Sequence, residues 1–183
     1  FVSILLFCFL AGCLPVPKNN DNLRNEGKPL VLTTFSVLAD MAKNVSGDRL
    51  IVNSITKIGA EIHGYQPTPS DLVKASKADL IIENGLGLEL WAKKFISTSK
   101  TVPTVELSRG MKPLLIEGDA YSGKPNPHAW MSPRRAMHYV DNIVAAFISI
   151  DPEGKNTYLQ NGEFYKFQLV QLDSDLKRAL KDI

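Results

Sequence analysis

Residues 30–56 read LVLTTFSVLADMAKNVSGDRLIVNSIT, and this stretch decides the fold class. Its first part, 30–35, is an apolar run rich in β-forming residues, which predicts a buried strand. A helix with Ser36 as its cap is expected over 36–46, because apolar residues recur three and four positions apart and a glycine follows. A second strand is expected over 50–56. The stretch is therefore typical of a strand–helix–strand unit.

The same alternation continues along the chain. A short helix capped by Ser70 is expected over 70–77, and a strand over 79–83 reads DLIIE. Gly85-Leu86-Gly87 makes the turn into a further helix, and a fourth strand is expected over 102–107. Alternating strands and helices predict an α/β fold, in which a four-stranded parallel sheet has helices on both faces.

Helices close the sequence. After a loop over 118–133 with several glycines and prolines, a helix is expected over 134–150. Asp151 and Pro152 are typical of a new helix start. Apolar residues then step by four and three to the end, so 151–183 is expected to form one long amphipathic helix. Its apolar stripe has no partner in this sequence, which indicates that a partner surface is missing.

The N-terminus is interpreted as part of a secretion signal. Residues 1–14 read FVSILLFCFLAGCL, carry no charge and are too short to span a bilayer. The initiator Met and basic region of a signal are absent, so 1–12 are interpreted as an incomplete signal peptide. LAGC at 10–13 resembles the lipobox of bacterial lipoproteins, in which the cysteine, here Cys13, is lipidated. The alternative is a core strand that happens to contain cysteine. With a lipobox, 13–29 are the lipidated cysteine and a flexible tether.

The composition limits the classes of function. The chain has 183 residues, of which 44% are hydrophobic, and 21 basic against 19 acidic residues give a net charge of +2. No charged block is present, so a nucleic-acid partner is not expected. If Cys8 is removed with the signal and Cys13 carries lipid, no thiol remains. Any metal site must then use histidine, carboxylate or backbone oxygen.

Two of the three histidines are candidate metal ligands. His63 and His128 both lie in loops with glycines and prolines, where binding groups of α/β proteins concentrate. Both loops can reach the same edge of the sheet, and imidazole binds zinc, iron and manganese through one nitrogen while a neighbour orients the other. The alternative is two exposed histidines without mutual contact. His138 lies within a predicted helix and is expected to be a surface or boundary residue.

Other patterns are less informative. Glu61 and Asp71 flank His63 and are expected to be surface and helix-terminus charges, or else acceptors that orient the imidazole. A dinucleotide loop at Gly85-Leu86-Gly87 is not expected, because Leu90 stands where the third glycine belongs. No catalytic triad is present, and neither catalytic nor cofactor-binding residues are assigned.

Three segments carry a family resemblance. EIHGYQPTPSDL at 61–72, ENGLGLELW at 83–91 and GKPNPHAWMSP at 123–133 resemble the metal-binding lipoprotein family. These are the solute-binding proteins of ABC transporters that import manganese, iron or zinc, and they include adhesin-like proteins. The resemblance implies two α/β lobes joined by one long helix, with the metal between them. It also implies that His63 and His128 are the metal ligands of the N-terminal lobe.

The resemblance implies a division of the chain and a function. Residues 30–150 are the N-terminal metal-binding lobe and 151–183 the connecting helix. By the same resemblance, we expect the C-terminal lobe, which would supply a Glu or His and an Asp ligand, to be absent from this sequence. The function implied is extracytoplasmic capture of a divalent metal ion for an ABC permease, by a protein held to the membrane through its lipid. Mn²⁺ or Fe²⁺ is favoured because the chain has only three histidines, and Zn²⁺ is a third candidate.

Two other functions are alternatives to metal capture for a permease. A truncated or degenerate gene product would act at most as a surface or adhesive lipoprotein without transport activity. A metal-dependent hydrolase would need three protein ligands and a base, whereas only two histidines are available. The chain is therefore not expected to be an enzyme.

Overall fold

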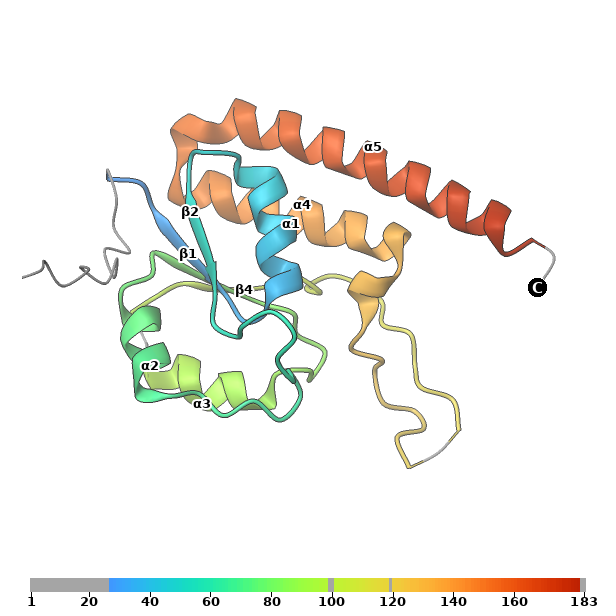
Figure 1. Ribbon diagram of the computed structural model, residues 1–183, viewed down its shortest axis with the longest axis horizontal. Coiled ribbons are helices and arrows are strands. Elements are labelled where there is room, and N and C mark those ends of the chain that lie inside the picture. Colours follow the sequence, from blue (N-terminus) through green and yellow to red (C-terminus); the bar gives the residue numbers. More distant parts are fainter. Residues whose placement is uncertain (1–26, 99–100, 119, 182–183) are drawn as a thin grey trace, which may run out of the picture.

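The four predicted strands form one all-parallel sheet (Figure 1). The structure, a computed structural model, describes residues 27–98, 101–118 and 120–181. The predicted signal peptide, Cys13 and most of the tether lie outside the described residues. The sheet has the strand order β2-β1-β3-β4, with β1 (Leu30–Thr33), β2 (Ile51–Ser54), β3 (Leu80–Glu83) and β4 (Thr104–Glu106).

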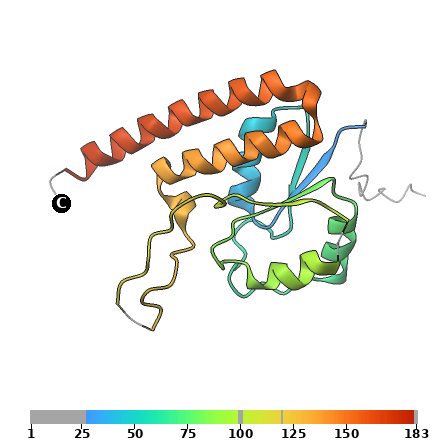
Figure 2. The ribbon, with the colours of Figure 1, turned by 180° about the vertical axis from the view of Figure 1, so that it is seen from behind.

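Helices cover both faces of the sheet, as predicted (Figures 1 and 2). On one face lie α1 (Ser36–Ser46), α4 (Pro133–Ile150) and α5 (Lys155–Ala179). On the other face lie α2 (Pro69–Ser76) and α3 (Leu90–Thr98), and two short 3₁₀ turns are η1 (Ala129–Met131) and η2 (Pro152–Gly154). None of the described helices has the length and apolar character needed to cross a membrane.

The central strand β1 shows why the chain folds in layers. All four of its residues are buried, and it pairs in parallel with β2 and with β3. Val31 joins the larger apolar core beneath α1 and α4, whereas Leu32 joins the smaller core with Ala75 of α2. Alternate side chains of a strand face opposite sides, so a run of apolar residues is needed where both faces are covered.

Two predicted helix caps are wrong. The N-cap of α1 is Phe35, which makes no side-chain cap hydrogen bond, and Ser36 is the first helical residue. The N-cap of α2 is Thr68 rather than Ser70. Its hydroxyl accepts from the backbone N–H of Asp71, and the Asp71 carboxylate accepts from the backbone N–H of Thr68. This reciprocal capping box, with proline at the first helical position, starts the helix at Pro69, one residue before Ser70.

The predicted helix over 151–183 is shorter than expected, since α5 begins at Lys155 and ends at Ala179, although the predicted break at Asp151 is present. The 3₁₀ turn η2 separates α4 from α5, and residues 182–183 lie outside the described residues. Arg49 donates from Nε and Nη2 to the two carboxylate oxygens of Asp151, at 2.8 and 2.9 Å. Gly154 is buried in this corner, where a Cβ atom would meet Asp151 and Tyr158. Close packing of the corner therefore requires glycine there and bends the chain before α5 begins.

The apolar stripe of α5 is buried only along its first part. Gly162 and Leu169 are buried against the lobe. Farther along, Leu172 and Leu176 are 47% and 42% exposed. The C-terminal end of α5 extends beyond the body of the molecule (Figures 1 and 2). Among the described residues, the predicted stripe thus continues past the surface that covers its start.

Candidate metal centre

The His63 loop connects β2 to α2. The carboxylate oxygen Oε1 of Glu61 accepts a hydrogen bond from the backbone N–H of His63 and lies 2.8 Å from its ring Nδ1. These contacts hold the pKa of Glu61 below its ordinary value, the backbone bond contributing most. Trp91 of α3 donates from Nε1 to the carbonyl oxygen of Ile62, at 2.8 Å. The loop is therefore fixed to α3 beside a half-exposed imidazole.

The His128 loop repeats this arrangement with a neutral residue. Oδ1 of Asn126 accepts from the backbone N–H of His128 at 3.0 Å and lies 3.1 Å from its Nδ1. The imidazole contacts the ring of Trp130, which contacts the buried ring of Phe35, with centroids 5.3 and 5.1 Å apart. Partial burial, and then the neighbouring His63, lower the pKa of His128. The neutral form that a metal ligand requires is thereby favoured.

The two imidazoles face each other through their free nitrogens. Nε2 of His63 lies 3.1 Å from Nε2 of His128, and the ring centroids are 5.3 Å apart. An Nδ1 that donates to Glu61 or Asn126 leaves Nε2 as an acceptor in the neutral ring. Two lone pairs then converge on one point. With metal–nitrogen distances of about 2.1 Å, a separation of this size fits two ligands of one ion at an angle of about 95°.

The remaining candidates have other places. Asp71 belongs to the capping box of α2 and accepts from the hydroxyl of Tyr65, at 2.9 Å. On α4, Nε2 of His138 lies 2.7 Å from the carbonyl oxygen of Arg109, so it donates there, in the boundary position that the sequence predicts. Glu61 accepts from the backbone N–H of His63 and lies beside its Nδ1, so it occupies the position of an acceptor that orients the imidazole. Asn126 was missed, although it precedes His128 by the same two residues as Glu61 precedes His63.

The facing pair alone does not make a complete metal site. Within 27–98, 101–118 and 120–181, no group of three or more His, Cys, Asp or Glu side chains is placed to hold a metal ion. A manganese or iron ion favours oxygen ligands in addition to imidazole. The described residues therefore offer at most two converging imidazole nitrogens to a metal ion, and further ligands would be needed to complete its coordination.

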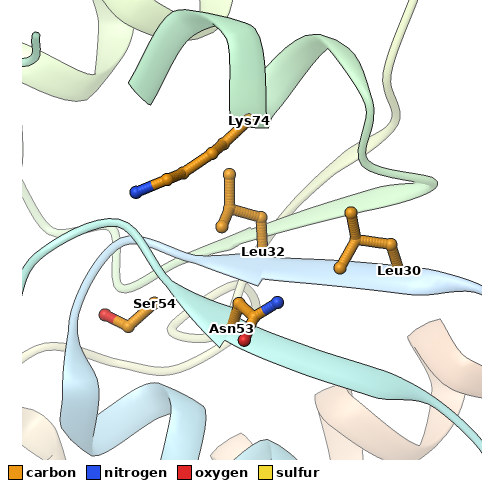
Figure 3. A pocket seen from close by; sticks show the side chains of 5 residues that line it. All are labelled: Leu30, Leu32, Asn53, Ser54 and Lys74. Carbon is orange, nitrogen blue, oxygen red and sulfur yellow. The ribbon is translucent and has the colours of Figure 1, made fainter. Parts of the chain in front are cut away.

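A small pocket elsewhere does not resemble this site (Figure 3). Leu30 and Leu32 of β1, Asn53 and Ser54 of β2, and Lys74 of α2 line a space of about 150 Å³. Lys74 extends from α2 over the sheet (Figure 3). Ligand pockets usually enclose about 300 Å³ or more. The space is too small for most ligands, and an ammonium group in its wall disfavours a cation.

Comparisons with known proteins find relatives along most of the chain. The family model described as zinc-uptake complex component A, periplasmic (ZnuA) matches residues 31–183. The chain is 44% identical over 181 residues to the iron-binding protein YfeA of Yersinia pestis, across 99% of this chain and 58% of that protein. It is 34% identical to the manganese ABC transporter substrate-binding lipoprotein PsaA of Streptococcus pneumoniae, across 100% of this chain and 61% of the relative. The chain thus spans about three fifths of the length of these relatives.

Solved structures show the same likeness. The Mn-bound periplasmic metal binding protein from Candidatus Liberibacter asiaticus superposes with a TM-score of 0.75 at 31% identity, over 85% of this chain and 58% of that one. The Zn(II)-bound ZnuA-like domain of Streptococcus pneumoniae AdcA gives a TM-score of 0.75 at 30% identity, over 85% of this chain and 57% of that one. The fold described above is therefore shared with proteins whose structures contain manganese or zinc.

Proposed function

Because this chain belongs to the ZnuA family of periplasmic metal-uptake components, we propose that it is the solute-binding component of an ABC importer, which captures a divalent metal ion. It binds and releases the ion and catalyses no reaction. One observation carries the proposal: Nε2 of His63 and Nε2 of His128 converge at 3.1 Å while both Nδ1 atoms are held by acceptors. This is the arrangement expected of two imidazoles that share an ion.

The ion proposed is Mn²⁺ or Fe²⁺, with Zn²⁺ as a third candidate. His63 and His128 supply half of its ligands, and oxygen donors complete the site. The relative with 44% identity is named an iron-binding protein, and another is named a manganese transporter component. The chain has only three histidines, and the third donates to a backbone carbonyl. These facts favour an ion that takes oxygen ligands.

The proposed location is outside the cytoplasm, with the protein held to the membrane by lipid on Cys13. The support is the LAGC sequence and the fact that several relatives are named lipoproteins. The proposed partner is the permease of the same metal importer, since these relatives are named as ABC transporter components. Metabolic labelling with a palmitate analogue tests the anchor, and Cys13→Ser should abolish the label.

Calorimetric titration with Mn²⁺ and Zn²⁺ tests the two ligands. We expect His63→Ala and His128→Ala each to weaken binding at least about tenfold, because each removes one of two nitrogen donors. Both histidines lie in loops, so the melting temperature should change little. His138→Ala is the matched control and should bind as the parent does. Loss of binding in His138→Ala but not in His63→Ala would contradict the assignment.

A further inference from the structure

The peptide group between Pro127 and His128 is held by hydrogen bonds at both its N–H and its C=O. Its N–H, from His128, donates to Oδ1 of Asn126 at 3.0 Å. Its C=O, from Pro127, accepts from Nδ2 of Asn84 at 2.9 Å. A peptide group is planar, so fixing both polar atoms fixes the plane and the direction in which the His128 side chain leaves the backbone. Asn126 is local to this loop, whereas Asn84 comes from a different part of the fold.

Asn84 is itself held in one orientation, so its side chain can fix the Pro127–His128 peptide group. It follows β3 directly and is fully buried. Nδ2 also donates to the carbonyl oxygen of Gly85 at 2.8 Å, and Oδ1 accepts from the hydroxyl of Tyr139 on α4 at 2.6 Å. Both amide hydrogens are therefore used, and the amide can point in only one direction. The contact with Tyr139 joins the His128 loop to the helix that follows it.

The turn after Asn84 is itself fixed by a buried carboxylate. Gly85, Leu86 and Gly87 have φ values of 81°, 55° and 80°, a left-handed run that is unfavourable for leucine. Oε1 of Glu89 accepts from the backbone N–H of Asn84 and from the hydroxyl of Thr34, both at 2.7 Å. The ends of β1 and β3 are thus joined beneath Asn84. This confirms that the glycine pattern is a strand-to-helix turn.

From these contacts we propose that Asn84 is a positioning residue for the metal site. It holds the Pro127–His128 peptide so that Nε2 of His128 meets Nε2 of His63. The inference rests on the proposed function, because it concerns the same two histidines. It adds a buried residue, outside both histidine loops, on which the geometry of the site depends.

Two measurements on the full chain test Asn84: Zn²⁺ affinity by calorimetry, and the imidazole ¹H–¹⁵N signals of the metal-free protein. We expect Asn84→Ala to raise the Kd for Zn²⁺ about tenfold and to move the His128 signals more than those of His63. Tyr139→Phe, which leaves the Asn84 donors in place, should have a smaller effect of the same kind. It also keeps the test open if Asn84→Ala does not fold.

The control is Tyr158→Phe, which alters a buried tyrosine hydroxyl bonded to Asp151. It should lower the melting temperature while leaving the Kd and the His128 signals unchanged. Unchanged His128 signals in both Asn84→Ala and Tyr139→Phe would overturn the inference, as would an unchanged Kd beside a parent that binds Zn²⁺. If the parent binds no Zn²⁺, the proposed function fails, and the metal-free signals still decide whether Asn84 positions His128.

Discussion

At the scale of single residues, Glu61 and Asn126 have the same task with different charge. Each precedes its histidine by two positions and accepts from that histidine's backbone N–H. Each also lies within hydrogen-bond distance of the ring Nδ1. A carboxylate increases the donor strength of an imidazole more than an amide does. If both histidines bind the metal ion as proposed, His63 is therefore expected to be the more electron-rich ligand.

Replacing Glu61 should weaken metal binding without affecting folding. Its side chain is 74% exposed, so Glu61→Ala removes the acceptor for His63 Nδ1 and little packing. We expect the Kd for Zn²⁺, measured by calorimetry, to rise about tenfold. Glu153→Ala, at an exposed acid in η2, is the control and should bind as the parent does. Equal Kd values for all three proteins would show that Glu61 does not orient the ligand.

Glu83 should make the stability of the chain depend on pH. Burial, and then the charges of Glu89 and Glu106, raise its pKa to about 7 from an ordinary 4.5. Between these two values the unfolded chain loses the proton while the folded chain keeps it. Stability should therefore fall as pH rises across this window and level off above pH 7.

Glu83→Gln removes this titration. Melting temperatures at pH 5 and pH 8 should differ less for Glu83→Gln than for the parent, because the amide carries no charge at either pH. Glu153→Gln, at the exposed acid, should keep the parent's difference. If the melting temperature fell by the same amount between pH 5 and pH 8 in Glu83→Gln and in the parent, the raised pKa of Glu83 would be contradicted.

At the scale of elements, α5 packs closely against α4 and α1 around Gly162. A Cβ atom on Gly162 would lie 2.7 Å from Cγ2 of Val144 on α4. One residue earlier, Asn161 donates from Nδ2 to the carbonyl oxygen of Val45 in α1, at 3.0 Å. Glycine is a poor helix former, and its presence here allows α5 to approach α4 closely.

Gly162→Ala should therefore destabilise the chain although alanine favours helices. Overpacking costs about 1–3 kcal/mol, and the better helix propensity offsets about 1 kcal/mol. We expect a net loss of about 1 kcal/mol in the free energy of unfolding, measured with urea. In the double variant with Val144→Ala, the two changes should couple favourably, since the clashing methyl group is gone. Additive losses would mean that the two side chains do not meet.

At the scale of the whole molecule, most features that depend on local sequence patterns were predicted correctly, whereas contacts between distant residues were not predicted. Strand and helix alternation, which depends on neighbouring residues, correctly predicted the parallel sheet and its helices. The break at Asp151 was predicted from Asp151 and Pro152, but its ion pair with Arg49 was not, because Arg49 lies 102 positions away in the sequence. The predicted start of α2 is wrong, because its true cap, Thr68, acts together with Asp71 rather than alone.

The candidate site shows the same difference between local sequence features and long-range contacts. Histidines in loops are visible in a sequence, and so is the spacing of Glu61 and Asn126 before them. The 3.1 Å approach of two rings 65 positions apart is not visible, because it depends on how the loops are fixed. Trp91 fixes one loop through Ile62, and Asn84 fixes the other through Pro127. Both contacts exist only once the sheet has brought these segments together.

We propose that His63 and His128 bind one ion together through Nε2. Imidazole ¹H–¹⁵N spectra recorded during a Zn²⁺ titration test it most directly, because they resolve each ring nitrogen and zinc is diamagnetic. We predict that the Nε2 signals of His63 and His128 shift together and saturate at one equivalent, while the signals of His138 stay in place. Saturation at two equivalents, a shift of only one of the two rings, or coordination through Nδ1 would contradict the claim.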